Sequence, residues 1–140
     1  MGHIIGFGNS NHLQNANEVS VDVTVKGKES SPSIPPESVF QKHEILIEME
    51  ILNAQQLQNN VVSWELKNIT DNVVIDSGTW IYGSDLDPDE QGIQPRTSFS
   101  KNIIYTTNCV GDVLRLKMWL PTGRTGERLT VSQIPNTFYS

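Results

Sequence analysis

The sequence predicts an all-β domain, an antiparallel β-sandwich of about seven strands with an extended N-terminal arm. Runs of alternating apolar and polar residues recur at short spacing, which is the pattern of half-buried strands. Turn-forming Gly, Pro, Asn and Asp residues separate the runs, and no run has the spacing of an amphipathic helix. With 140 residues, the chain is long enough for one domain with a buried core.

The first strand is expected at VSVDVTVK, where valines alternate with polar residues. A proline-rich connector follows, because proline removes main-chain donors and restricts the preceding residue. The turn NITDN joins two later runs as a hairpin, and Gly78 is expected to mark a bulge or bend in the second of them. The expected strands cover residues 19–26, 44–52, 61–68, 73–83, 97–105, 112–121 and 128–134.

Alternation also predicts which side chains face the core, since successive side chains of a strand point to opposite faces. In the strand at 112–121, Arg115 and Lys117 fall on the outward row together with Trp119. The residues expected to face inward on three central strands are Ile45, Ile47, Met49, Ile51, Val62, Trp64, Leu66, Leu114, Leu116, Met118 and Leu120.

Three segments are expected: an arm at residues 1–17, the sandwich at 18–135 and a tail at 136–140. The arm has bulky apolar residues without any helix or strand period, namely Ile4, Ile5, Phe7 and Leu13. Such a segment cannot form its own core. We therefore expect it to dock on a neighbouring subunit, at a sheet edge or in a groove. The alternative is that it lies along its own sandwich.

Charge and composition exclude several classes of function. The net charge of −6 argues against nucleic-acid binding. No apolar run is long enough to cross a membrane, and the N-terminus lacks the pattern of a secretory signal. The single cysteine, Cys109, allows no intrachain disulfide and favours synthesis in a reducing cytoplasm. Residues 1–90 include fourteen acidic and four basic side chains, whereas residues 91–140 include two acidic and six basic ones. We expect strands of the two halves to alternate within a sandwich, so that these opposite charges lie next to each other.

The order ILIEMEILN, VVSWELKNITDNVVIDSGT, FSKNIIY, GDVLRLKMWL resembles an immunoglobulin-like module of the kind found in bacterial and phage surface proteins. Trp64 corresponds to the buried aromatic residue of the central strand in that pattern. The resemblance covers residues 19–134 and is architectural, and the antibody-type cysteine pair is absent. It implies an Ig-like sandwich that serves in an adhesin, a fibre or a virion surface. A jelly roll is the alternative fold.

The segment DLDPDE is the candidate metal site, because carboxylate oxygens from one loop are the ligands that Ca²⁺ takes. Its residues are Asp85, Asp87, Asp89 and Glu90. The segment lacks the glycine and the distant glutamate of an EF-hand loop, so a solvated acidic loop is the alternative. No other cofactor is expected.

A second candidate site is a ligand or partner face formed by Trp80, Tyr82, Trp119 and Arg124. Exposed Trp and Tyr are typical of glycan platforms and protein interfaces. The paired carboxylates Glu48 and Glu50 share an outward face, where we expect a solvated surface rather than a glycosidase pair. Arg115 and Lys117 are their candidate cross-strand partners.

These patterns predict a non-enzymatic structural subunit, most simply a phage virion component such as a capsid-decoration, head or tail protein. Its arm would dock to neighbouring subunits, which are copies of itself or other proteins of the particle. No catalytic motif surrounds Cys109, which we expect to be an ordinary thiol. The alternative is an extracellular or cell-surface module that binds carbohydrate or protein. Neither nucleic-acid binding nor membrane insertion is expected.

Overall fold

All of the regular secondary structure in the residues that the computed structural model describes is β-strand. These residues are 5–6, 8–26, 41–54, 60–83, 92, 96–106 and 109–139. The strands are β1 (Ile5–Gly6), β2 (Asn9–Ala16), β3 (Glu18–Thr24), β4 (Gln41–Ala54), β5 (Asn60–Asn68), β6 (Val73–Tyr82), β7 (Ser98–Thr106), β8 (Val113–Trp119) and β9 (Gly126–Tyr139). An all-β architecture is therefore confirmed.

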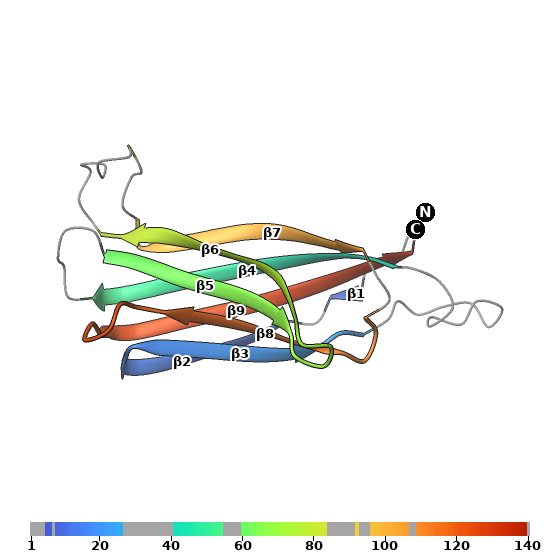
Figure 1. Cartoon of the computed structure of the whole chain (residues 1–140), viewed down its shortest axis with the longest axis horizontal. Helices are drawn as coiled ribbons and strands as arrows, with labels where there is room; N and C mark the ends of the chain where they lie inside the picture. Colours follow the sequence, from blue (N-terminus) through green and yellow to red (C-terminus); the bar gives the residue numbers. More distant parts are fainter. Residues whose placement is uncertain are drawn as a thin grey trace.

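Two antiparallel sheets form the layers of a sandwich (Figure 1). The first sheet, sheet A, has the order β2-β9-β4-β7, and β1 continues the edge position of β2 along β9. The second, sheet B, has the order β3-β8-β5-β6. The edge strands β2 and β3 lie side by side at one margin of the sandwich, and β6 and β7 lie at the other.

The strand order is that of a jelly roll. Along β2 to β9, every connection passes from one sheet to the other except the hairpin that joins β5 to β6. The first of these strands pairs with the last, and the second pairs with the seventh, which is the double Greek key of a jelly roll. In an immunoglobulin sandwich the first two strands share a sheet. The Ig-like order was therefore wrong, and the jelly-roll alternative describes the chain.

All seven expected strands are present, with boundaries shifted by a few residues. Two terminal segments differ from expectation. Residues 9–16, expected as part of an extended arm, form β2 through main-chain pairing with β9. Residues 136–139, expected as a tail, continue β9 alongside β4. Both segments pair through the main chain, which leaves little trace in side-chain periodicity.

The core lies between the two sheets and is formed by the inward rows that alternation predicted. Trp64 is one of its two buried tryptophans and rests against Gly78 of β6. A Cβ atom at Gly78 would lie 3.0 Å from Cζ2 of the Trp64 indole, so this glycine leaves room for the ring. The bulge expected at Gly78 instead falls in the β5–β6 register between Leu66 and Lys67.

The margin between β6 and β7 is bridged by an ion pair. Lys101 occupies an inward position on β7, and its Nζ lies 2.9 Å from Oδ2 of Asp76 on β6. The same ammonium lies 5.7 Å from the ring centroid of Trp64, and the Phe99 ring stacks on Trp80. Charged side chains therefore close this side of the sandwich over an aromatic cluster.

Candidate functional site

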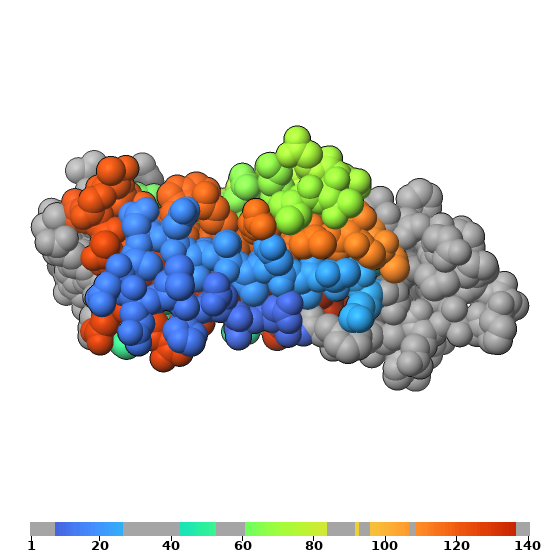
Figure 2. Space-filling view, turned by 90° about the horizontal axis from the view of Figure 1, so that it is seen from below, coloured from blue at the N-terminus to red at the C-terminus, as the bar shows by residue number. Residues whose placement is uncertain are grey.

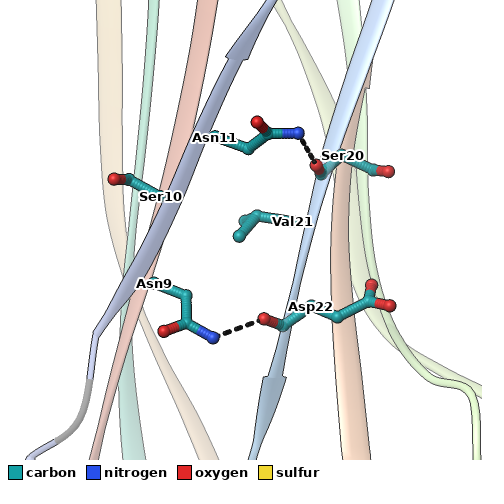
Figure 3. Close-up of a pocket in the computed structure, with 6 residues that line it drawn as sticks. All are labelled: Asn9, Ser10, Asn11, Ser20, Val21 and Asp22. Carbon is teal, nitrogen blue, oxygen red and sulfur yellow. Dashed lines mark hydrogen bonds between the residues drawn. The ribbon is translucent and has the colours of Figure 1, made fainter.

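A cleft lies at the opposite margin, between β2 and β3. This β2–β3 cleft has a volume of about 320 Å³ and is lined by Asn9, Ser10, Asn11, Ser20, Val21 and Asp22. Figure 2 looks at this margin, with β2 and β3 in blue across the surface. Figure 3 shows Asn9 and Asn11 of β2 reaching towards the main chain of β3.

Two asparagine amides span the cleft. Nδ2 of Asn9 donates to the carbonyl oxygen of Asp22 at 2.7 Å, and Nδ2 of Asn11 donates to that of Ser20 at 2.9 Å. Side chains two residues apart on a strand point to the same side, and so do the carbonyls of residues two apart. The spacing on β2 therefore matches the spacing on β3. The two asparagines satisfy the free edge of β3 as a neighbouring strand would.

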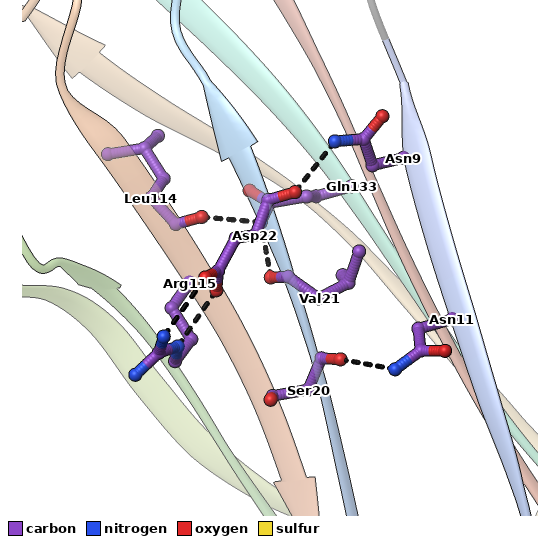
Figure 4. A network of polar contacts seen from close by, with 8 residues as sticks. All are labelled: Asn9, Asn11, Ser20, Val21, Asp22, Leu114, Arg115 and Gln133. Carbon is purple, nitrogen blue, oxygen red and sulfur yellow. Dashed lines mark hydrogen bonds and ion pairs between the residues drawn. The ribbon is translucent and has the colours of Figure 1, made fainter.

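A buried amide supports the same part of β3 from inside the sandwich (Figure 4). Gln133 of β9 is fully buried, and its Nε2 donates to the carbonyl oxygens of Val21 at 2.9 Å and Leu114 at 2.8 Å. It ties sheet A to both β3 and β8. The Oε1 atom of the same side chain is buried without a hydrogen-bond partner.

On the outer face of sheet B, β3 is joined to β8 by paired charges. Arg115 donates through Nε and a terminal nitrogen to the two carboxylate oxygens of Asp22, at 2.8 and 2.9 Å. These hydrogen bonds and the carboxylate charge raise the pKa of the Arg115 guanidinium. Lys117 lies 3.1 Å from Glu18. These pairs join acidic residues of the first half of the chain to basic residues of the second.

The connection from β2 to β3 is short and firmly held at its end. Asn15 adopts a left-handed backbone conformation with φ of 50°, which asparagine tolerates better than most residues. Nδ2 of Asn17 donates to the carbonyl oxygens of Leu120, Pro121 and Arg124 at 2.9 to 3.1 Å. The Leu120 amide donates back to the Asn17 carbonyl at 2.8 Å. Asn17 is thus a fixed point, and the turn precedes it.

The edge strand β2 is exposed and lacks the charged residues that would discourage pairing with another chain. Its sequence, NSNHLQNA, holds no Asp, Glu, Lys, Arg or Pro, and all of its residues except Ala16 are exposed. Natural proteins often protect edge strands with charged residues or proline. Of the other edge strands, β3, β6 and β7 each contain at least one charged residue, including Asp22, Asp76 and Lys101, and β1 is only two residues long. Among the described strands, β2 is the edge most open to another chain.

A second concave surface lies on the outer face of sheet A. This carboxylate–hydroxyl groove has a volume of about 470 Å³. Strand register places Glu48 between Ser100 and Ser132, and places Glu50 between Ser98 and Thr130. The remaining lining residues are Met49, Arg96 and Phe99. Carboxylates, hydroxyls and a guanidinium together provide both acceptors and donors of hydrogen bonds.

The expected pairing of these carboxylates with Arg115 and Lys117 was wrong. Glu48 and Glu50 lie on sheet A, whereas both cations lie on sheet B and pair with Asp22 and Glu18. Sequence alone could not assign the two rows to different sheets, because each is simply an outward row.

The expected arm residues fall partly within the described chain. Leu13 lies on β2 and is 46% exposed, although its cross-strand neighbour Leu129 is buried. Ile5 lies on β1 and pairs with Thr137 of β9. Ile4 and Phe7 lie outside the described residues. The described part of the arm therefore docks on its own sandwich, the alternative to a neighbouring subunit.

The expected ligand face is divided. Trp80 and Tyr82 are buried in the core, so their expected place on an exposed face was wrong. The segment at Arg96 runs beside the end of β6 and bridges to Tyr82, which interrupts the alternation there. Trp119 is half-buried on the outer face of sheet B, with Nζ of Lys117 lying 5.3 Å from its ring centroid. Arg124 is half-buried in the loop between β8 and β9.

The candidate Ca²⁺ ligands Asp85, Asp87, Asp89 and Glu90 lie outside the described residues. Within the part of the chain that the structure describes, no three His, Cys, Asp or Glu side chains gather as a metal site would require. The described part also contains no helix long and apolar enough to cross a membrane.

Cys109 is buried beside a polar cluster at one end of the sandwich. Burial, together with the charge of Asp112, raises the pKa of its thiol to about 12, so the thiol stays protonated at neutral pH. Burial likewise raises the pKa of Tyr105, although a hydrogen bond with Asn68 acts against this. Asn68 donates to Asp112 at 2.8 Å and accepts from the Asp71 amide. A protonated, buried thiol is a packing group rather than a nucleophile.

Sequence reasoning missed Asn9, Asn11 and Gln133, which tie the β2–β3 margin together. The signal for the first two was present, since Asn9, Asn11 and Leu13 alternate along the segment. Their amides are polar, so a search for alternating apolar residues passes over them. For Gln133, nothing in VSQI distinguishes a buried amide from an exposed one.

No protein-family model matches the chain, and no curated protein matches it. The chain is similar to the dimeric latent PorU from Porphyromonas gingivalis, with 11% identity, 99% of this chain and 13% of that chain covered, and a TM-score of 0.43. It is also similar to the structure of infectious bursal disease virus, Gx strain, with 8% identity and a TM-score of 0.42. That match covers 100% of this chain and 32% of the viral chain. For the Gt strain of that virus the identity is 9%, the match covers 99% of this chain and 33% of that chain, and the TM-score is 0.33. The chain thus spans at most 33% of these structures. Similarity this low carries no argument about function.

Proposed function

We propose that the chain is a non-enzymatic structural subunit of a larger protein assembly. In particular, we propose a virion component such as a capsid-decoration, head or tail protein of a phage, made in the host cytoplasm. Its partners are copies of itself or other subunits of the particle. The N-terminal strand β2 makes the contact, as an element of the folded sheet rather than as a free arm.

The observation that carries this proposal is the unguarded edge formed by β2. This strand combines seven residues paired with β9, exposure of every residue except Ala16, and the absence of Asp, Glu, Lys, Arg and Pro. An edge of that kind is a template for pairing with another chain, and monomeric proteins normally block it. The jelly-roll order adds support by analogy, because viral capsid domains often use it, although a fold alone does not decide function.

Solution mass tests the proposal. Multi-angle light scattering on the full chain, from micromolar to millimolar concentration, is expected to show a mass that rises above the 15.6 kDa of one chain. The rise should reverse on dilution, because specific association obeys mass action whereas aggregation does not. A mass of one chain at every concentration would overturn self-association. In that case the proposal requires a different subunit as the partner, and the chain is expected to co-purify with another protein of the particle.

A second candidate function is carbohydrate binding, and the carboxylate–hydroxyl groove favours it. Sugar hydroxyls both donate and accept hydrogen bonds, and the groove offers Glu48 and Glu50 as acceptors with Arg96 as a donor. The volume of about 470 Å³ lies within the usual range of small-molecule sites.

Titration of isotopically labelled protein with lactose and with chitotriose, followed by NMR, tests this second function. Binding in the groove is expected to shift the amide signals of Ser98, Ser100 and Ser132, and Glu48→Gln should weaken it. Glu65→Gln, on the outer face of the other sheet, is the matched control and should leave binding unchanged. Shifts confined to the surroundings of Trp119, or no shifts with either sugar, would exclude the groove as a site for these sugars.

A further inference from the structure

We infer that two copies of this chain associate by exchanging their N-terminal strands, so that β2 of each copy pairs with β9 of the other. The inference rests on the proposed self-assembly and names its partner and its mechanism. The occupant of the β9 edge in the assembly is therefore a segment of a second copy. Each exchanged strand makes the same pairs with β9 that it makes within one chain.

The strand β2 can leave the sheet without dismantling the core. All of its residues except Ala16 are exposed, and the core residues of the described chain begin at Val19 on β3. Its partner β9 also pairs with β4 along thirteen register positions from Gln41 to Ala54, so β9 stays in place when β2 departs. Segments with little buried surface open at low free-energy cost compared with global unfolding.

The turn before β3 has the features of a hinge. Asn17 is clamped by three side-chain hydrogen bonds to the loop after β8, and by the Leu120 amide. Two residues before it, Asn15 sits in the left-handed region and interrupts the pairing of β2 with β9. A short connection favours exchange, because the open form releases the turn while the exchanged strand keeps its pairing.

A β2 strand from another copy can make the same contacts as the chain's own β2. The strand binds β9 through the main chain and β3 through the side-chain amides of Asn9 and Asn11. The β2 strand of a second copy has the same groups and can make the same contacts. Side-by-side addition of a strand to the outer edge of β2 would leave these contacts within each chain. In strand exchange, β9 of one copy is therefore paired with β2 of the other copy. In side-by-side addition, β9 stays paired with β2 of its own chain.

Cysteine pairing distinguishes the two modes. Ser10 and Ser132 are directly opposed on β2 and β9, at a spacing that a disulfide spans, so the double variant Ser10→Cys/Ser132→Cys records which chains are paired. Equal amounts of unlabelled and heavy-isotope-labelled double variant are mixed under reducing conditions at high concentration. The mixture is then oxidised with oxidised glutathione and digested. The native Cys109 is buried, so it does not compete.

Exchange predicts disulfide-linked peptides in which one partner is labelled and the other is not, together with a covalent dimer on a denaturing gel. Oxidation at high dilution should give only bonds within one chain, and the single variant Ser10→Cys should give no such dimer. Association by light scattering with only within-chain bonds would overturn exchange while leaving self-assembly intact. Neither association nor mixed bonds would overturn both. An equal yield of dimer from the single variant would also overturn exchange, because it would reflect collision of exposed thiols.

Discussion

The side-chain amide of Asn11 donates a 2.9 Å hydrogen bond to the main-chain oxygen of Ser20, across the margin between the two sheets. Asn9 repeats the contact two residues earlier, with Asp22. In this way the first long strand of one sheet satisfies the free edge of the other. The N-terminal segment is therefore part of the jelly roll, and it is also the part least anchored by side-chain burial.

The asparagine pair is expected to stabilise the closed margin. The double variant Asn9→Ala/Asn11→Ala should lower the free energy of unfolding by roughly 1 kcal/mol for each hydrogen bond lost. Urea denaturation followed by circular dichroism measures this loss. Gln14→Ala, on the opposite face of β2, is the control and should change stability by a few tenths of a kcal/mol at most. Equal effects from the variant and the control would show that the amides do not hold the margin.

Gly78 is expected to tolerate no side chain. In Gly78→Ala, the new Cβ would press on the Trp64 indole, which is buried and cannot easily move away. Overpacking of this kind costs about 1–3 kcal/mol, and denaturant midpoints would report it. Thr79→Ala, on the outward row next to it, serves as the matched control. A Gly78→Ala variant as stable as the unmodified chain would mean that the indole has room to shift.

Lys101 is expected to guard the β7 edge more than it stabilises the fold. Its ion pair with Asp76 is 45% and 31% exposed, and such pairs contribute under about 1 kcal/mol. Lys101→Met should therefore unfold near the same temperature but aggregate faster, because an inward charge on an edge strand discourages pairing. Light scattering during incubation below the melting temperature measures this. The charge-swapped variant Lys101→Asp/Asp76→Lys should restore solubility, and failure of the swap to do so would argue against an edge-guard role.

Cys109 is expected to make stability depend on alkaline pH. The folded thiol has a pKa of about 12 against an ordinary value of 9.0, so above pH 9 the unfolded chain loses a proton that the folded chain keeps. The folded state then binds more protons than the unfolded state, and the free energy of unfolding falls as the pH rises from 9 towards 12. Cys109→Ala should make this decline shallower, although the raised pKa of Tyr105 leaves part of it. An unchanged slope in Cys109→Ala would indicate an exposed thiol, as would rapid labelling of the native protein at neutral pH.

The strands from β3 to β9 were predictable because each buries one face against the opposite sheet. Val21 and Leu116, for example, are opposed and both buried, and each lies in an alternating run that reveals its strand. Their pairing was not predictable, because the two residues are far apart in the sequence. Alternation shows which face of a strand is buried, but it does not show which of the two sheets the strand joins. The jelly-roll order depends on such distant pairings, so the sequence left it as one of two alternatives.

The strand β2 was missed for a different physical reason. It buries almost no side chain, so hydrophobic periodicity, which depends on burial, cannot reveal it. The positions of Trp80 and Tyr82, near the end of β6, were misjudged although both lie on the inward row of that strand, where Trp80 is opposed to the buried Val62. There the neighbouring segment at Arg96 covers the strand, and three successive residues of β6 are buried.

The most direct test of the account is whether residues 9–16 form the edge strand of the chain's own sheet in dilute solution. Assembly, exchange and the asparagine contacts all require it. Cross-strand nuclear Overhauser effects between β2 and β9, such as those linking Asn11 to Val131 and Leu13 to Leu129, measure it in a monomeric sample. The account predicts these contacts together with strand-like chemical shifts from Asn9 to Ala16. Random-coil shifts without any contact to β9 would contradict it and would return the segment to the status of a free arm.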